Sequence, residues 1–277
     1  METKIIDGRK IRDELLSKIK ERVASLSFVP VFCDVLVGDD KVSLQYVEMK
    51  AKTALSVGIN FHHAKFNKDI SSDDLKKEIE IINNIENMCG LIVQLPLPKS
   101  IDKQSVCDAI VKEIDVDFLS NQASLDFYSG VSKIGFPTAI SCVYMLDYLG
   151  LDLSNKNIVV LGQGELVGKP VSYILESRGF VVHRVTSLTE DKEQIIKNAD
   201  VIISGMGNGK YITGSMIKEG VVIIDAGTSE SNSSIVGDVD FDSVVGKARY
   251  VSPVPGGVGP VTIAMLLLNV LTVAENK

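Results

Sequence analysis

Short apolar segments alternate with amphipathic helical segments along almost the whole chain. The runs 29–37, 90–95 and 157–161 have the character of buried strands, and helical patterns such as 9–25 and 42–57 separate them. Strands that alternate with helices form parallel βαβ units, because each crossover helix covers one face of the sheet. The sequence therefore predicts an α/β fold rather than a β-sandwich.

A polar and irregular stretch, 113–137, divides this pattern into two series. The second series of strands and helices begins at Lys156. With 277 residues, the chain is long enough for two modest domains that each have a core. We predict two α/β domains, 1–137 and 138–259, with the first completed by an apolar C-terminal helix over 260–277.

The composition argues against several classes of function. Hydrophobic residues make up 45% of the chain, charged residues 23%, and the net charge is −7. This balance is typical of a soluble globular protein, and nucleic-acid-binding proteins carry clustered Lys and Arg instead. No apolar run reaches the roughly 18 residues of a membrane helix, and the N-terminus lacks the apolar core of a secretory signal. We predict a cytoplasmic protein that contacts neither nucleic acid nor a membrane.

Cysteine and histidine usage argues against a metal centre. The four cysteines are scattered, no CxxC pair occurs, and only three histidines are present. Zinc sites need closely spaced Cys and His ligands, so no metal is expected. Sparse cysteines also suit a reducing compartment.

A glycine-rich turn, Gly162-Gln163-Gly164, stands between a predicted strand and a predicted helix. Glycines permit a tight turn there, and the helix N-terminus offers N–H groups to phosphates. The GxGxxxG spacing is one residue longer than the usual dinucleotide fingerprint, so a purely structural turn remains the alternative. Its place in the βα pattern favours contact with a phosphate-bearing cofactor.

The strand after this turn gives a mixed signal about the cofactor. It carries no clear acidic residue at its end, where NAD enzymes usually hold the ribose 2′-hydroxyl. Arg184 could face a 2′-phosphate or could equally point to solvent. Further on, small residues follow Asp225 up to Thr228, as expected where backbone passes close to a cofactor.

Polar side chains in the first half form a candidate catalytic set. Tyr46 and Lys50 are four residues apart and so share a helix face, where a phenol beside an ammonium can handle protons. Gln94 ends an apolar strand, the position at which α/β sheets place their sites. Asp115 and Asp117 follow, and one of them could accept hydrogen bonds from a heterocycle. The alternatives are a solvated helix face, a satisfied buried glutamine and ordinary loop aspartates.

The stretch 253–262 is the most unusual part of the sequence. Six of the eight residues from Pro253 to Pro260 are Gly or Pro, and an apolar helix follows them. Glycines let a ligand approach the main chain and prolines stiffen it. A rigid loop with few side chains can form the wall of a site for a flat ligand or a dinucleotide, although most Gly/Pro clusters are ordinary loops.

Together these motifs resemble the methylenetetrahydrofolate dehydrogenase/methenyltetrahydrofolate cyclohydrolase family over essentially the whole chain and in the same order. The resemblance rests on Val37–Asp40 with Ser43, Gln45, Tyr46, Val47 and Lys50, and on Gly90–Lys99, Asp115–Asp117, Val167–Pro170, Val236–Phe241 and the Gly/Pro loop.

The resemblance implies a fold, two reactions and a set of roles. The fold has two α/β domains flanking a cleft, the C-terminal one a Rossmann-like dinucleotide-binding domain, and the protein is usually a homodimer. A hydride passes from 5,10-methylenetetrahydrofolate to NADP⁺, and water opens the methenyl product to 10-formyltetrahydrofolate without a metal. Lys50 would be the central catalytic group, Tyr46 and Gln94 would set its position and protonation, and Asp117 would anchor the pterin ring.

The resemblance also implies binding roles for backbone-rich segments. The loop with Pro255 and Gly259 would border both the folate and the nicotinamide. The cofactor would contact the turn Gly162-Gln163-Gly164, together with Thr186 and Thr228.

The sequence departs from the family mainly on the cofactor side. Gly162-Gln163-Gly164 occupies the place of the usual Gly-Arg-Ser. Val185-Thr186 occupies the place of His-Ser, so that only the hydroxyl of Thr186 is kept. The segment 136–139 replaces Pro-Cys-Thr-Pro, Asp225–Thr228 replaces Asp-Val-Gly-Ile, and Phe118 replaces a glycine. An amide binds phosphate less strongly than a guanidinium does, so NAD becomes possible beside NADP.

Two other functions remain open at this point. A cyclohydrolase with a degraded cofactor site would bind neither nicotinamide cofactor. A non-enzymatic regulator that binds folate or a nucleotide would keep the fold without the chemistry.

Overall fold

The computed structural model describes residues 2–231 and 234–277, which form two compact units. The three-stranded unit comprises residues 14–137 and 263–277, and the six-stranded unit comprises residues 2–13 and 138–262. The first segment joins the six-stranded unit because β1 (Lys4–Ile5) pairs in parallel with β11 (Tyr250–Val251). The prediction from the sequence instead assigns residues 2–13 to the domain 1–137.

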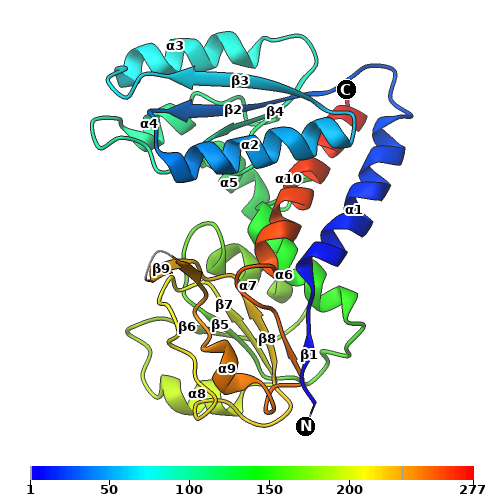
Figure 1. The fold of residues 1–277 in the computed structure, drawn as a ribbon, viewed down its shortest axis with the longest axis vertical. Helices are drawn as coiled ribbons and strands as arrows, with labels where there is room; N and C mark the ends of the chain where they lie inside the picture. Colours follow the sequence, from blue (N-terminus) through cyan, green and yellow to red (C-terminus); the bar gives the residue numbers. More distant parts are fainter. Residues whose placement is uncertain (1, 232–233) are drawn as a thin grey trace. The chain divides into compact units, whose positions relative to one another are not determined.

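The three-stranded unit has a parallel sheet in the order β3-β2-β4, covered by helices on both faces (Figure 1). Its elements, in chain order, are α1 (Gly8–Val23, shared with the other unit), β2 (Val31–Val37), α2 (Lys41–Ser56), β3 (Asn60–Phe66), α3 (Ser72–Asn83), β4 (Met88–Val93), α4 (Lys103–Cys107) and α5 (Asn121–Tyr128). The helices α2 and α3 are the crossovers between parallel strands and lie on opposite faces of the sheet.

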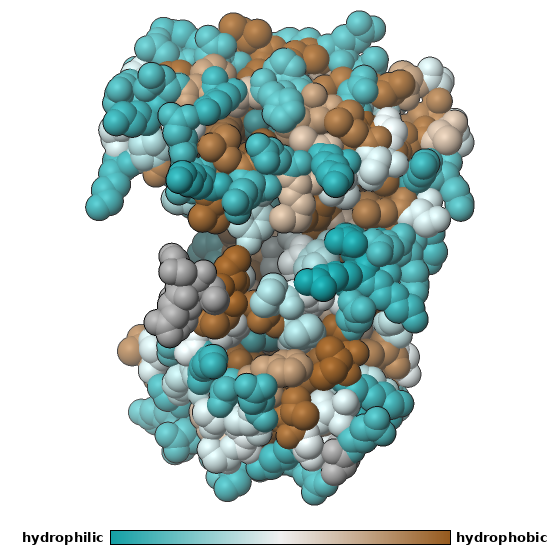
Figure 2. All heavy atoms as spheres, viewed as in Figure 1, coloured by the Kyte–Doolittle hydropathy of each residue, from teal (hydrophilic) through white to brown (hydrophobic). Residues whose placement is uncertain are grey.

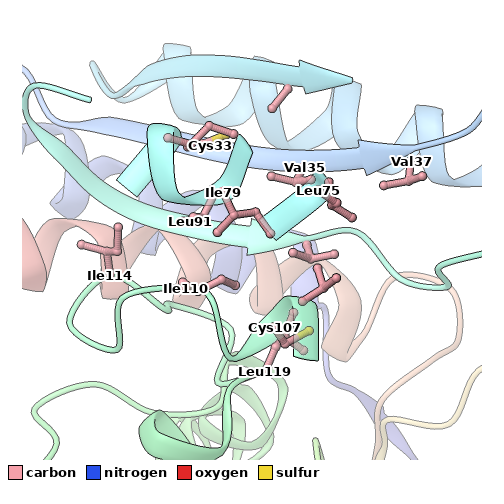
Figure 3. Packing of buried hydrophobic residues seen from close by; sticks show 14 of the residues in the cluster. Cys33, Val35, Val37, Leu75, Ile79, Leu91, Cys107, Ile110, Ile114 and Leu119 are labelled. Carbon is pink, nitrogen blue, oxygen red and sulfur yellow. The ribbon is translucent and has the colours of Figure 1, made fainter. Parts of the chain in front are cut away.

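Side-chain alternation along β2 divides the core between these faces. Cys33, Val35 and Val37 pack against α3 and α4 (Figure 3). Phe32 points the other way and packs with Ala54 of α2 and with α10 (Val258–Glu275). Because successive strand residues face opposite sides, Asp34 and Leu36 share the face of Phe32.

The stretch 113–137, predicted to be irregular, contains helix α5, so this prediction was wrong in part. Ser120 caps the helix by accepting a hydrogen bond from the Ala123 N–H. Its buried face is short, which leaves little periodicity in the sequence. Phe127 of α5 packs against Phe118, whose φ of +59° lies in the region that favours glycine. The aromatic contacts hold a bulky residue where the family usually has glycine.

The six-stranded unit has a parallel sheet in the order β1-β11-β8-β7-β5-β6 (Figure 1). Its remaining elements are α6 (Pro137–Tyr148), β5 (Ile158–Leu161), α7 (Gly168–Ser177), β6 (Val182–Val185), α8 (Lys192–Asn198), β7 (Val201–Ser204), β8 (Val222–Asp225), β9 (Ser229–Ser231), β10 (Ser234–Val236) and α9 (Phe241–Val244). The chain leaves β5 toward β6 and returns to β7 on the other side of β5. Such a reversal of strand order marks the ligand crevice of an open α/β sheet.

Helix α10 is long and apolar enough to cross a membrane by length and composition alone, with a mean hydropathy of 1.8. However, 56% of it is buried inside the protein. Leu267, Val270 and Leu271 are fully buried in the core that contains Phe32. An apolar core helix has this character, and hydrophilic residues are interspersed with hydrophobic ones on the viewed surface of each unit (Figure 2).

Candidate functional site

Lys50 lies on the inward face of α2 and is only 8% exposed. Asp40 fixes the start of this helix, because its carboxylate accepts a hydrogen bond from the Ser43 N–H at 2.8 Å. The Lys50 ammonium donates to Gln94 Oε1 at 2.7 Å. The structure thus brings together two members of the predicted catalytic set from α2 and the end of β4.

The orientation of Gln94 is set by its own backbone neighbour. Its Nε2 donates to the Leu95 carbonyl at 2.7 Å, which turns Oε1 toward Lys50. Tyr46 lies one helical turn before Lys50 and is 38% exposed. Its phenol is therefore accessible on the same side of α2 as the ammonium.

Asp34 is a partner of Lys50 that the sequence analysis missed. Its carboxylate lies 2.5 Å from Lys50 Nζ, and the residue is 1% exposed. Burial raises the pKa of Asp34, and the Lys50 charge opposes that rise. An aspartate in the middle of the apolar run 31–37 is the signal that could have revealed it, because strands bury such a residue only with a partner.

The two aspartates after β4 have different surroundings. Asp115 is fully buried and accepts hydrogen bonds from the N–H groups of Leu119 and Ser120, so it fixes the following loop. Asp117 is half-buried near Lys50, Asp34 and Asp115. Burial raises the pKa of Asp117 to about 7, with the Lys50 charge opposing and the two other carboxylates adding to the rise.

The glycine turn after β5 allows α7 to approach the strand closely. Gly162 has a φ of +82°, and an added Cβ would lie 2.7 Å from the Gly205 carbonyl oxygen. A Cβ on Gly168 would lie 1.8 Å from the Gly162 carbonyl oxygen. Among the described residues no side chain caps α7, but the Lys169 N–H in its first turn donates to the Gly164 carbonyl at 3.2 Å, and Pro170 has no N–H to donate. Gly164 lies in the exposed part of the turn.

A cavity of about 370 Å³ opens beside this turn. It lies at the carboxyl ends of β5, β6 and β7, where the strand order reverses. Its lining comes from the ends of these strands, from α8 and from the loop after β7, and comprises Leu161, Gly162, Gln163, Val185, Thr186, Ser187, Lys192, Ile196, Met206, Asn208 and Tyr211. Three of the predicted cofactor residues, Gly162, Gln163 and Thr186, thus share one cavity.

The cationic group at this cavity is Lys192, which the sequence analysis did not single out. Among the described lining residues it carries the only formal charge. Arg184, the alternative considered from the sequence, forms a bidentate pair with Glu176 of α7. The Gln163 amide donates to the Gly162 carbonyl at 3.0 Å, while its buried Oε1 has no partner among the described residues.

Two buried aspartates fix the loops at this edge of the sheet. Asp238 accepts hydrogen bonds from Ser204 Oγ and from the N–H groups of Met206 and Asn208, each at 2.7 Å. Asp225 accepts from the N–H groups of Gly227, Asp238 and Val239. Burial raises the pKa of Asp225 to about 6, opposed by these backbone hydrogen bonds. Thr228 follows this anchored segment and is exposed.

The Gly/Pro loop packs tightly on the start of α1. The Gly8 N–H donates to the Gly256 carbonyl at 3.0 Å, and a Cβ on Gly8 would lie 1.8 Å from the Gly257 carbonyl oxygen. Gly256 has a φ of +107°. Pro255 is exposed on this loop, and Gly259 is exposed in the first turn of α10, which begins at Val258. The loop is thus held through its backbone and leaves both residues accessible.

The arrangement of residues fits a dinucleotide and a proton-handling reaction. The cavity beside the glycine turn is lined by a glycine, by the hydroxyls of Thr186 and Ser187 and by the Lys192 cation, which together suit a phosphate-bearing cofactor. The group around Lys50 combines an ammonium, an amide and two carboxylates of raised pKa, which suits proton transfer near neutral pH.

Comparisons with known proteins match the whole chain to one group. The model of the tetrahydrofolate dehydrogenase/cyclohydrolase catalytic domain matches residues 6–117, and that of the NAD(P)-binding domain of the same family matches residues 137–277. The bifunctional protein FolD of Hydrogenobaculum sp. (strain Y04AAS1) is 40% identical over 99% of both chains.

Solved structures give the same result. The bifunctional FolD enzyme, methylenetetrahydrofolate dehydrogenase/cyclohydrolase, of Campylobacter jejuni has a TM-score of 0.94 at 32% identity over 99% of both chains. The Trypanosoma brucei enzyme, solved with its NADP cofactor and an inhibitor, has a TM-score of 0.93 at 32% identity, over 100% of this chain and 98% of that one.

Proposed function

The chain belongs to the tetrahydrofolate dehydrogenase/cyclohydrolase family, and from this premise we propose which residues carry its reactions. The enzyme oxidises 5,10-methylenetetrahydrofolate to 5,10-methenyltetrahydrofolate with a nicotinamide cofactor. It then hydrolyses the methenyl form to 10-formyltetrahydrofolate. The observation that carries the assignment of residues is the Lys50 ammonium held at 2.7 Å by Gln94.

For the oxidation, the residues act mainly by alignment. When bound, the nicotinamide supplies a hydride acceptor, and the substrate's nitrogens stabilise the cation that remains. The protein has to hold two rings in register and keep water away until the hydride has moved. We assign the Gly/Pro loop, through Pro255 and Gly259, to this task because its backbone is fixed and these two residues are accessible.

For the hydrolysis, Lys50 is the group that moves protons. Gln94 accepts one ammonium hydrogen and thereby fixes the direction of the side chain. Tyr46, one turn earlier, presents its phenol on the same side. These two residues position Lys50 against the substrate, and Lys50 exchanges a proton with the attacking water.

Asp117 is proposed to bind the pterin ring. Its half-buried carboxylate can accept the two N–H groups of an amidine-like edge, a strong charge-assisted contact when the acid is ionised. The position beside Lys50 supports this role, because Lys50 is one of the charges that act on Asp117.

NADP⁺ is the proposed cofactor, bound at Gly162, Gln163, Gly164, Thr186 and Thr228. The support is Lys192 together with the hydroxyls of Thr186 and Ser187 in the cavity, which can meet a 2′-phosphate without the usual arginine. The unpartnered Oε1 of Gln163 could accept from a ribose hydroxyl, so NAD⁺ is the competing cofactor.

We further propose a cytoplasmic homodimer that contacts neither nucleic acid nor a membrane. The net charge of −7 and the burial of α10 support the last two points. Light scattering of the purified protein tests the dimer, which a mass of about one chain would refute. The domain boundaries near 137 and 260 remain part of this proposal.

A spectrophotometric assay tests the proposed function. Purified protein is given 5,10-methylenetetrahydrofolate with NADP⁺ or NAD⁺, and methenyl hydrolysis is followed in parallel. We expect both reactions, with the oxidation faster on NADP⁺. Hydrolysis without oxidation would identify a cyclohydrolase alone, and no turnover in either assay would refute an enzymatic role. Lys50→Gln should abolish hydrolysis, and full activity in this variant would refute the role of Lys50.

A further inference from the structure

Asp34 occupies an unusual place for a charged residue. It lies in the middle of β2, the central strand of the three-stranded sheet, on the face that it shares with Phe32 and Leu36. It is 1% exposed, and the apolar core around Phe32 covers this face. A carboxylate loses its hydration there, which is unfavourable unless another group compensates.

The compensating group is the proposed catalytic lysine. Among the described residues, the Lys50 ammonium is the only group in polar contact with Asp34, at 2.5 Å. The other buried aspartates, Asp115, Asp225 and Asp238, each accept hydrogen bonds from backbone N–H groups and so fix loops. Asp34 fixes no loop.

The stability of the fold gives no reason for this pair. Replacing a buried ion pair by apolar residues of similar size is often neutral or stabilising, because both charges must be desolvated. An apolar residue at position 34 would simply continue the core of β2. The carboxylate therefore points to a task at Lys50 rather than to a task in folding.

We propose that Asp34 is a positioning residue for the hydrolysis, which holds the Lys50 ammonium beside Gln94 and accepts the proton that Lys50 passes on. This inference rests on the proposed function. In this proposal, a proton follows a path from water to Lys50 and from Lys50 to the buried carboxylate of Asp34.

The protons and charges of this path balance. As the water oxygen bonds to the methenyl carbon, a water proton moves to Lys50 and an ammonium proton moves to Asp34. The substrate cation becomes neutral, Lys50 remains an ammonium and Asp34 becomes a neutral acid. The bond from this carbon to N5 then breaks, the hydroxyl proton moves to N5, and the formyl group forms. The proton on Asp34 is the one that the whole hydrolysis releases.

Other titratable groups face Asp34 from the neighbouring elements. His63 on β3 is its register partner, and Asp117 interacts electrostatically with both Asp34 and Lys50. The His63 charge lowers the pKa of Asp34, but burial outweighs this effect and the pKa is raised. A carboxylate of raised pKa holds a transferred proton more readily than an ordinary aspartate does, which suits a proton acceptor.

The test compares two reactions of one protein. Asp34→Asn keeps the shape of the side chain and removes its charge. We expect kcat for methenyl hydrolysis to fall by about tenfold or more, up to the roughly 10²–10⁴-fold that general acid–base catalysis contributes, and kcat for oxidation to fall by less than about threefold. We also expect the acid limb of kcat for hydrolysis, measured at saturating folate, to disappear in this variant. Asp73→Asn is the matched control, because it removes an exposed carboxylate paired with Lys76 on α3.

Several results would overturn the inference. Equal losses in both reactions, unchanged hydrolysis, or an acid limb of kcat for hydrolysis retained in Asp34→Asn would each show that Asp34 does not take the proton. If wild-type protein performed neither reaction, the proposed function itself would fail, which the same assay separates from a failure of Asp34.

A measurement on the wild-type protein covers the case that the variant does not fold. The Asp34 carboxyl carbon, labelled with ¹³C, is titrated by NMR in protein saturated with a folate analogue that does not react, because kcat reports ionisations of the ligand-bound enzyme. Its midpoint should coincide with the acid limb of kcat for hydrolysis, and two clearly different values would overturn the inference.

Discussion

At the scale of single residues, the site around Lys50 is defined by the hydrogen-bond acceptors that surround its ammonium group. Lys50 has three N–H donors, of which Gln94 and Asp34 take two. The third remains for the substrate or for water. An amide on one side and a carboxylate on the other restrict the side chain to one direction, which a lysine on a solvated helix face would not have.

The state of Asp117 predicts how substrate binding depends on pH. Burial raises the pKa of Asp117 to about 7, so in the free enzyme the carboxyl is largely protonated below that pH and ionised above it. In the proposed contact with the pterin, only the ionised form would accept two N–H groups. We therefore expect kcat/KM for the folate in both reactions to fall as pH drops below about 7. Asp117→Asn should lower kcat/KM and remove this limb, whereas a limb that persisted would belong to another group.

Lys192 predicts the cofactor preference. Removing a cation that meets a 2′-phosphate weakens NADP⁺ but leaves NAD⁺ nearly unaffected. For Lys192→Gln we expect KM for NADP⁺ to rise about tenfold or more, and KM for NAD⁺ to change by less than about twofold. Lys197→Gln, at the exposed end of the same helix, serves as the control. Equal changes for the two cofactors would place the 2′-phosphate elsewhere.

Residues whose role depends on their spacing can be recognised in the sequence. Residues whose role depends on burial are harder to recognise. Tyr46 and Lys50 are recognisable because i and i+4 share a helix face, and Gln94 because it ends a strand. Asp34 and Lys192 are not adjacent in sequence to the groups that they serve. Their roles become visible only when α2 lies on β2 and α8 lies beside the glycine turn.

At the scale of elements, α7 can pack closely on the end of β5 because two glycines leave no side chains between them. The contact between Gly168 and the Gly162 carbonyl leaves no room for a Cβ. We expect Gly168→Ala to shift α7, to destabilise the protein by about 1–3 kcal/mol as overpacking does, and to reduce oxidation more than hydrolysis.

Gly164→Ala is the matched control within the same turn. An added Cβ at this position has no atom within 4 Å, so urea unfolding should show little change. If the two variants were equally stable, close packing of helix on strand would not be the reason for the glycine at 168.

Elements with strong periodicity could be predicted, and short ones could not. The strands and crossover helices from β2 to β8 follow from apolar runs and helical spacing, to within a few residues at their ends. Several elements are too short to show a periodic pattern in the sequence: helix α5, the two-residue strands β1 and β11, and the antiparallel pair β9 and β10. Their formation depends on tertiary partners, such as the parallel pairing of β1 with β11.

At the scale of the whole molecule, each unit is assembled from two segments of the chain. The core of the three-stranded unit contains Leu267 and Val270, which lie almost at the end of the sequence, beside Phe32 near its start. The six-stranded unit likewise takes β1 from residues far from the rest of its sheet. Neither unit is a continuous piece of sequence.

Removing residues 263–277 tests this dependence. The remaining chain would expose the core face around Phe32 and Ala54, because α10 supplies its cover. We expect the truncated protein to lose hydrolysis and the cooperative unfolding of its three-stranded unit. NADPH binding, followed by fluorescence, should persist because the six-stranded unit keeps all its segments. Retained hydrolysis would show that α10 is dispensable for the core.

The order in which these segments emerge from the ribosome follows from the same feature. Strand β2 and helix α2, which carry Asp34 and Lys50, are synthesised early, but the apolar residues that cover their sheet come after nearly all the rest. The earlier residues of the three-stranded unit therefore keep part of their apolar core exposed until residues 263–277 leave the exit tunnel. During this time they are accessible to chaperones and prone to aggregation. Domains in general fold N-terminal first during synthesis; here the part that begins earlier is completed later.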